Sequence, residues 1–175
     1  MGEPGADRLN GIDVSPHGSN EDPGGAAGEV SLLCRVESLL CALPLGSVVE
    51  TMRPLPVVPL ADAPSYVRGI SLIRGAPVPV VDFAALLGRR ESRPNRLVTV
   101  VHDGRTLALT VDAVLGIRTI DTEQLLEPSA LLGDHFGEVV SAVGSLDAGL
   151  LSVLRVTRLI PDSVWAAADE TAAAS

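Results

Sequence analysis

The stretch Pro64-Ser-Tyr-Val-Arg-Gly-Ile-Ser-Leu-Ile-Arg-Gly-Ala-Pro-Val-Pro-Val-Val-Asp-Phe83 decides the fold of this chain. Two apolar runs, 67–73 and 78–81, flank a short segment of Arg, Gly, Ala and Pro, and such a segment is typical of a turn. The stretch therefore predicts two antiparallel strands, followed by a short helix at 83–87.

The same pattern occurs three more times, so the sequence predicts a protein built from strand pairs. The further pairs are 31–36 with 39–43, 98–101 with 106–111 around Asp103-Gly104, and 139–146 with 150–154 around 147–149. Short helices are also expected at 45–52, 112–115 and 156–160. The expected fold class is therefore all-β with short helices.

The two ends of the chain differ in composition from the rest. Residues 1–28 are rich in Gly, Pro, Asp, Asn and Ser, and they cannot bury enough apolar surface to offset the entropy of ordering. We expect 1–28 to be a disordered acidic tail whose deletion leaves the melting transition nearly unchanged. We also expect 166–175 to be a short, frayed and disordered tail, which leaves one domain of two subdomains over 29–165.

An internal repeat relates the two halves of this domain. A shift of 66 places Cys41, Leu43, Leu45, Val48 and Val49 on Leu107, Leu109, Val111, Val114 and Leu115. A shift of 73 places Val80, Val81, Phe83, Leu86 and Leu87 on Val153, Leu154, Val156, Leu159 and Ile160. Each half then contains a hairpin, a short helix, an extended segment, a second hairpin and a second short helix. A unit of this size could close a small barrel of roughly five strands.

The charge pattern excludes some classes of partner. The formal net charge is −9, of which residues 1–29 carry −5, residues 166–175 carry −2 and the segment 30–165 only −2. An acidic chain without a basic stripe argues against nucleic acid or anionic lipid as the main partner. No signal peptide is visible, and the longest uncharged apolar stretch, 39–49, is too short to span a bilayer. We therefore expect a cytoplasmic protein.

The sequence contains no pattern of a catalytic, nucleotide or metal site. It has no Walker loop, no Gly-x-Gly-x-x-Gly after a strand, no His-Glu-x-x-His and no nucleophile elbow. The histidines His17, His102 and His135 are far apart along the chain. Asp82 and Asp112 each follow an apolar strand, where an Asp is more often the N-cap of the next helix than an acid or base. We expect no enzyme, no metal and no cofactor.

Cys34 and Cys41 are symmetrically placed about Glu37-Ser38. A two-residue turn there would put the two thiols opposite each other on neighbouring strands. A redox switch is conceivable, but two buried, reduced thiols acting as small apolar side chains fit a reducing compartment better.

Arg74 stands between an apolar strand and Gly75. An Arg in this position is either a solvated turn residue or a partly buried side chain that requires a carboxylate partner. Gly75 supports a turn with unusual backbone angles or close approach by another chain.

The stretch from Pro64 to Phe83 resembles the signature of the CheW family of chemotaxis coupling proteins. That signature combines an aromatic-aliphatic-x-Gly element, an aliphatic stretch, Arg-Gly, and Pro-aliphatic-aliphatic-Asp at fixed spacing. The segments 43–50 and 107–112 also fit, so the resemblance covers about 30 to 163. It implies two intertwined five-stranded barrels of the SH3 type.

The resemblance also implies a function. CheW proteins are adaptors that join the regulatory domain of the histidine kinase CheA to the cytoplasmic tips of chemoreceptors, without direct membrane insertion. The positions that the family uses for this coupling are occupied by Val48, Gly69, Arg74 and Gly75, and Glu50 matches the acid that pairs with the family's Arg. One departure is Leu72, which replaces the family's usual Asn.

Two alternatives stay open at this point. The chain could be a CheW-like scaffold in a signalling system other than flagellar chemotaxis. It could also be a small-molecule-binding or hydrolytic β-barrel, which an apolar pocket with converging polar groups would favour. An exposed apolar groove without such groups would favour the two adaptor hypotheses.

Overall fold

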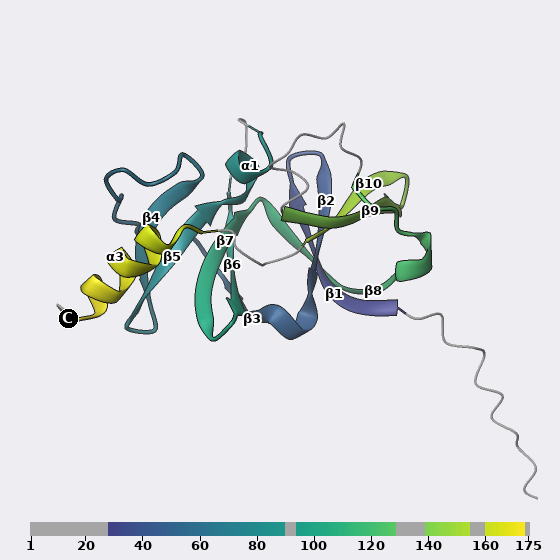
Figure 1. The fold of residues 1–175 in the computed structure, drawn as a ribbon. Helices are drawn as coiled ribbons and strands as arrows, with labels where there is room; N and C mark the ends of the chain where they lie inside the picture. Colours follow the sequence, from purple (N-terminus) through teal and green to yellow (C-terminus); the bar gives the residue numbers. More distant parts are fainter. Residues whose placement is uncertain (1–27, 90–93, 129–138, 155–159, 174–175) are drawn as a thin grey trace, which may run out of the picture.

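The computed structural model describes residues 28–89, 94–128, 139–154 and 160–173 (Figure 1). The strands in these segments are β1 (Gly28–Val36), β2 (Leu39–Pro44), β3 (Val48–Met52), β4 (Val67–Ile73), β5 (Ala76–Asp82), β6 (Arg96–His102), β7 (Arg105–Val111), β8 (Ala113–Asp121), β9 (Val140–Leu146) and β10 (Gly149–Leu154). The helices are η1 (Leu45–Ser47), α1 (Phe83–Leu86), η2 (Thr122–Gln124) and α3 (Asp162–Ala173). The four predicted strand pairs are confirmed as β1–β2, β4–β5, β6–β7 and β9–β10.

The strands form two five-stranded sheets that lie side by side in Figure 1. Sheet A has the order β8-β1-β2-β10-β9, and sheet B has the order β3-β6-β7-β5-β4. Each sheet contains one parallel pair, β2 with β10 in sheet A and β7 with β5 in sheet B. The expected all-β class with two five-stranded units is confirmed.

The internal repeat is visible in the strand register. Ala42 pairs with Val153 in the parallel ladder of sheet A, and Ala108 pairs with Val80 in that of sheet B. The shift of 66 relates Ala42 to Ala108, and the shift of 73 relates Val80 to Val153. They also connect two bulges, because the register skips Val49 between β3 and β6 and Leu115 between β8 and β1. The two sheets therefore share one backbone plan.

The two halves of the sequence do not fold as separate units. Sheet A takes β1 and β2 from the first half and β8, β9 and β10 from the second, whereas sheet B is formed by the continuous run β3 to β7. The chain thus leaves sheet A after Pro44 and returns to it after Val111. Strand exchange of this kind makes the two units intertwined, as the resemblance implies.

The largest hydrophobic cluster lies between the two sheets. Side chains that face it from the central strands include Cys41 and Leu43 of β2 and Leu107 and Leu109 of β7. The other face of each sheet buries a smaller cluster, formed by Leu33, Ala42, Ile120, Leu151 and Val153 in sheet A and by Ile73, Val78, Val80, Leu97 and Ala108 in sheet B. Central strands that are buried on both faces need apolar residues at nearly every position, which explains the continuous aliphatic runs.

Neither sheet is closed by a continuous ladder within the described residues, but one isolated bridge ties the two edges of each. In sheet B, the segment after β3 reaches β4, where Val58 and Ile70 exchange two backbone hydrogen bonds of 2.8 and 2.9 Å. In sheet A, the segment after β8 reaches β9, where Leu126 and Val143 exchange two of 2.8 Å. These isolated bridges are the backbone contacts that join the two edges of each sheet and so make it resemble a barrel.

The predicted helices are confirmed only in part. The helix at 83–87 is present as α1, and Asp82 caps it by accepting a hydrogen bond from the Ala85 N–H at 3.1 Å. The helix at 45–52 is wrong, because only η1 is helical and β3 pairs with β6. The helix at 112–115 is also wrong, since β8 pairs there with β1. Most of the segment 156–160 lies outside the described residues.

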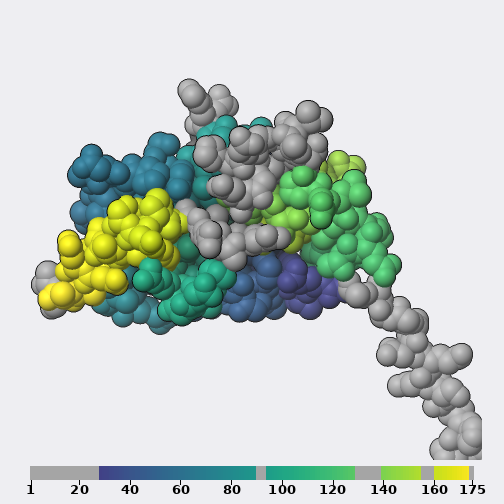
Figure 2. All heavy atoms as spheres, in the orientation of Figure 1, coloured from purple at the N-terminus to yellow at the C-terminus, as the bar shows by residue number. Residues whose placement is uncertain are grey.

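Helix α3 (Asp162–Ala173) makes the segment 166–173 helical, which corrects the frayed tail expected at 166–175 for its described residues. Helix α3 runs along sheet B and contacts β5 (Figures 1 and 2). Val164 and Ala168, four residues apart on one face, are 2% and 4% exposed. The guanidinium of Arg105 lies 5.2 Å from the centre of the Trp165 ring. An Ala-rich segment favours a helix, and the packing of this face fixes it on the sheet. The expected tail at 1–28 lies outside the described residues except for Gly28, which begins β1.

Candidate functional site

An ion pair between Glu50 and Arg74 forms the centre of the candidate site. Arg74 donates from Nε to Glu50 Oε1 at 2.8 Å and from Nη2 to Glu50 Oε2 at 2.6 Å. This is the two-bond geometry that a planar guanidinium offers to a carboxylate. The Glu50 side chain is 23% exposed and that of Arg74 is 79% exposed, so the pair lies at the surface with its acid largely covered.

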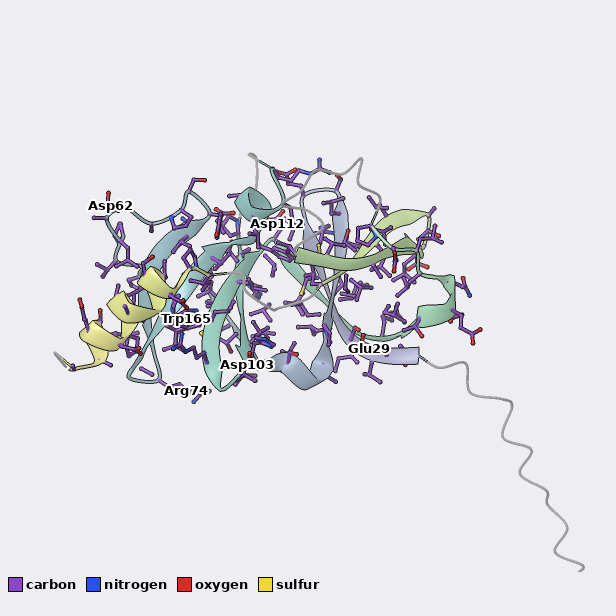
Figure 3. All side chains as sticks on the ribbon, viewed as in Figure 1. Glu29, Asp62, Arg74, Asp103, Asp112 and Trp165 are labelled. Atoms are coloured by element: carbon purple, nitrogen blue, oxygen red, sulfur yellow. The ribbon has the colours of Figure 1, made fainter. Side chains whose placement is uncertain are left out.

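Arg74 is held in place by the turn between β4 and β5. The turn consists of Arg74 and Gly75 alone, because Ile73 already pairs with Ala76. Both turn residues have positive φ, 53° for Arg74 and 82° for Gly75, as a two-residue hairpin of type I′ requires. Figure 3 shows Arg74 at the tip of this hairpin, at one end of sheet B.

Glu50 is held in place by the bulge in the edge strand β3. The register there passes from the Val48–Val100 pair to the Glu50–Thr99 pair. The Thr99 hydroxyl accepts a hydrogen bond from the Glu50 N–H at 3.2 Å and donates one to the Glu50 carbonyl at 3.3 Å. Thr99 is a site residue that the sequence alone does not reveal, because nothing in the sequence shows which residue will lie opposite a bulge.

The ion pair changes the acidity of its carboxyl group. The hydrogen bonds from Arg74, aided by its positive charge, hold the pKa of Glu50 below its ordinary value, although partial burial opposes this effect. Glu50 therefore stays ionised, and the pair stays intact, to a lower pH than an isolated glutamate would allow.

The five predicted site residues do not form one surface. Glu50, Arg74 and Gly75 come together, and Gly75 is open enough that a Cβ there would meet no atom within 4 Å. Val48 is half-buried and packs against the cluster between the sheets. Gly69 is buried, with φ of 135°, and a Cβ there would lie 1.9 Å from the carbonyl oxygen of Val58. Gly69 thus permits the bridge that ties sheet B together.

A cavity of about 380 Å³ opens beside the bridge between Val58 and Ile70 of β4. It is lined by Leu55, Pro56, Val58, Leu60, Ile70, Ser71, Leu72 and Thr171, so its walls are mainly aliphatic. Leu72, which replaces the family's Asn, is 57% exposed there. The two polar residues of this lining are Ser71, which is buried, and Thr171.

The two cysteines lie as predicted. Cys34 and Cys41 are directly opposite each other in the β1–β2 pair, and both are buried and free. Burial raises the pKa of each thiol to about 12. Such thiols are protonated at neutral pH, so they act as apolar side chains and not as nucleophiles.

The other titratable candidates have structural positions. Asp112 was expected to cap a helix, but it instead accepts a hydrogen bond from the Glu37 N–H at 2.7 Å and so links the end of β7 to the β1–β2 turn. His102 is half-exposed, with its Nε2 3.1 Å from an oxygen of Asp103. His17 and His135 lie outside the described residues.

No group of three or more His, Cys, Asp or Glu side chains in the described residues could hold a metal ion. No helix in the described segments is long and apolar enough to cross a membrane.

Comparison with known proteins identifies the family. A sequence profile of the CheW-like domain matches residues 31–164. The Myxococcus xanthus protein named Protein FrzA is 32% identical over 133 residues, which cover 72% of this chain and 81% of that protein. The chemotaxis protein CheW of Rhizobium meliloti (strain 1021) is 29% identical over 109 residues, or 61% of this chain and 70% of that protein.

A solved structure agrees in fold. The scaffolding protein TtCheW from Thermoanaerobacter tengcongensis superposes with a TM-score of 0.65 at 20% identity, over 74% of this chain and 90% of that one. The profile match spans both sheets, from β1 into the first turn of α3. On this shared sequence pattern and fold, the chain belongs to the CheW-like family.

Proposed function

We propose that this chain is a non-enzymatic chemotaxis adaptor that couples the regulatory domain of a CheA-like histidine kinase to the helical tips of chemoreceptors. It would work in the cytoplasm, where those tips lie. Support comes from the family match over 31–164 and from relatives that carry the name chemotaxis protein CheW. The relatives belong to a family of scaffolds, which supports binding rather than catalysis as the function.

The Glu50–Arg74 pair carries the proposal for the binding surface. An exposed ion pair contributes little to folding, because water and salt screen it. A two-bond pair at a hairpin tip nevertheless fixes the shape of the surface. Its most direct use is to present a rigid edge, with the open backbone of Gly75 beside it, to a partner.

The test is to measure binding of a purified CheA-type regulatory domain, and separately of a receptor tip fragment, from the same organism. Arg74→Ala should weaken binding of at least one of them about tenfold or more, as loss of an anchoring Arg does. Arg74→Lys should rescue poorly, because an ammonium group cannot form both bonds to the carboxylate.

The matched control is Arg118→Ala, which removes an exposed Arg from β8, the strand of sheet A that is equivalent to β3. Circular dichroism and melting should show that all three variants stay folded. Unchanged binding of both partners by folded Arg74→Ala would remove the pair from the coupling surface.

A CheW-like scaffold in a system other than flagellar chemotaxis is the second candidate. It is favoured by the match to Protein FrzA, which has higher identity and coverage than the chemotaxis relative from Rhizobium meliloti. Deletion of the gene separates the two candidates. Loss of swimming chemotaxis supports the first, and loss of another signalled behaviour with intact swimming chemotaxis supports the second.

A further inference from the structure

Thr99 is a buried polar residue in the aliphatic middle of β6. Its residue exposure is 1%, and its neighbours in β6, Val98 and Val100, are fully buried. Both hydrogen bonds of its hydroxyl group go to one residue, the N–H and the C=O of Glu50. A hydroxyl that serves both backbone groups of a single residue restrains the orientation of that residue.

These two hydrogen bonds lie directly beside the bulge in β3. A bulge interrupts the ladder and leaves backbone groups of the edge strand without regular partners. Here the register skips Val49, and Glu50 comes next. The Thr99 hydroxyl adds two hydrogen bonds to the backbone of Glu50 beside this interruption, so a residue on β6 restrains the position from which the Glu50 side chain leaves β3.

Sheet A provides an internal comparison. The repeat places Leu33 at the position of Thr99 and Gly116 at the position of Glu50, and these two residues again lie opposite each other after the bulge. Leu33 has no hydroxyl and Gly116 has no side chain to orient. The bulge therefore forms without a threonine, and the hydroxyl occurs only in the sheet that also carries the ion pair.

We propose that Thr99 is a positioning residue of the coupling surface, whose buried hydroxyl holds the backbone of Glu50 so that the carboxylate meets Arg74 through two bonds. This inference rests on the proposed function, since it assumes that the pair serves partner binding. The ion pair would then be one member of a chain of contacts from the interior of sheet B to its surface.

The test uses Thr99→Val, which keeps the shape of the side chain and removes the hydroxyl. Two quantities are measured, the pKa of Glu50 by carbon-detected NMR titration and the affinity for the CheA-type regulatory domain. In Thr99→Val the Glu50 pKa should rise towards that of a free glutamate, because the two-bond pair is loosened. The affinity should fall about threefold to tenfold, which is what the net value of one hydrogen bond converts to.

Two further variants separate positioning from stability. Thr99→Ser restores the hydroxyl and should restore both the pKa and the affinity. Thr110→Val is the matched control, because Thr110 is also buried and accepts a hydrogen bond from a backbone N–H, that of Phe83, at 3.3 Å. It should lower stability without changing the Glu50 pKa or the affinity. If Thr99→Val does not fold, Thr99→Ala takes its place.

The outcomes distinguish this inference from the proposed function. An unchanged Glu50 pKa and an unchanged affinity in Thr99→Val would overturn the positioning role, while Arg74→Ala still tests the surface. A raised pKa with unchanged affinity would keep the positioning role for the ion pair and would count against the proposed use of that pair in coupling.

Discussion

Sheet A and sheet B are two versions of one backbone plan, and their differences show where the function lies. Both have the same strand order, one parallel pair, a bulge at the same repeat position and one isolated bridge between their edges. The positions of Glu50 and Arg74 in sheet B correspond to Gly116 and Asp147 in sheet A. The backbone arrangement of a sheet therefore does not depend on the ion pair, since sheet A has the same arrangement without it.

The backbone also limits where such a pair can form. Gly116 has φ of 124°, a region that residues with a Cβ rarely adopt, whereas Glu50 is not among the described residues with positive φ. A glutamate at position 116 would be strained before it reached a partner. The two sheets therefore diverged in backbone angle at the one position that matters for the pair.

The largest expected effect is a difference in stability between glycine-to-alanine variants next to the two isolated bridges. In sheet B, Gly69→Ala would place a Cβ 1.9 Å from the Val58 carbonyl oxygen at a residue with φ of 135°. Strain and overpacking together should cost about 3–5 kcal/mol of the free energy of unfolding. In sheet A, a Cβ at Gly144 would be close to the Cδ2 atom of Leu125, at 2.7 Å, and this flexible end can move, while the Gln124 carbonyl oxygen at 3.8 Å is an ordinary contact. We expect a loss of about 1 kcal/mol there.

Urea unfolding of both variants measures this difference. Gly46→Ala is the control, because a Cβ at Gly46 would meet no atom within 4 Å, and its stability should stay within about 0.5 kcal/mol of the parent. Equal losses for Gly69→Ala and Gly144→Ala would contradict the difference in packing between these two glycines.

A second prediction concerns the thiols, which only sheet A carries between the sheets. Burial raises the pKa of Cys34 and Cys41 to about 12, while an exposed thiol in the unfolded chain ionises near pH 8.5. Above pH 8.5 the unfolded chain loses protons that the folded chain keeps, so stability falls as the pH rises. At pH 9.5 the two thiols should together cost about 2–3 kcal/mol relative to pH 7.

The double variant Cys34→Val/Cys41→Val tests this directly. It makes sheet A resemble sheet B, where the repeat places Val100 and Leu107 at these positions. Its stability between pH 7 and pH 9.5 should fall less than that of the parent protein. A parallel loss in both proteins would assign the alkaline sensitivity to other groups.

The smallest expected effect concerns α3, which packs on sheet B. Arg105→Ala removes the cation from the face of the Trp165 ring and should cost about 0.5–1 kcal/mol. Trp165 is the one tryptophan of the chain, so its fluorescence reports the contact without interference. Arg96→Ala serves as control, because the Arg96 guanidinium donates a hydrogen bond to the carbonyl of the adjacent Asn95 at 2.7 Å. Identical emission spectra for Arg105→Ala and the parent would show that the ring does not sense this cation.

The sequence predicted local structure well, because hairpins depend on neighbouring residues. The turn pairs Asp103-Gly104 and Arg74-Gly75 lie between apolar runs, and both hairpins formed as expected. The helices expected at 45–52 and 112–115 failed for a different reason. β3 and β8 are edge strands that exist only because they pair with distant strands, and their own apolar spacing does not show this.

The exchange of strands between the sheets was also beyond the reach of pattern analysis. Both halves have the same periodicity, so nothing in the repeat shows whether a hairpin pairs within its own half or with the other. The contact between Glu50 and Arg74 could be expected only from the family resemblance. The contact of Thr99 with Glu50 became visible only once the strand register was known. The contact of Val58 with Gly69 became visible only from the bridge between them in three dimensions.

The route of the chain sets an order of events during synthesis on the ribosome. Every strand of sheet B lies between Val48 and Val111, so this sheet can pair as soon as that contiguous stretch has emerged. The hairpin β1–β2 is made first, yet its parallel partner is among the last strands, since Leu40 pairs with Leu151. Until β10 arrives, the flank of β2 is an open edge that can pair with another chain. A nascent chain that stalls after Val111 would therefore expose a ready template for aggregation, whereas completion of the last hairpin removes it.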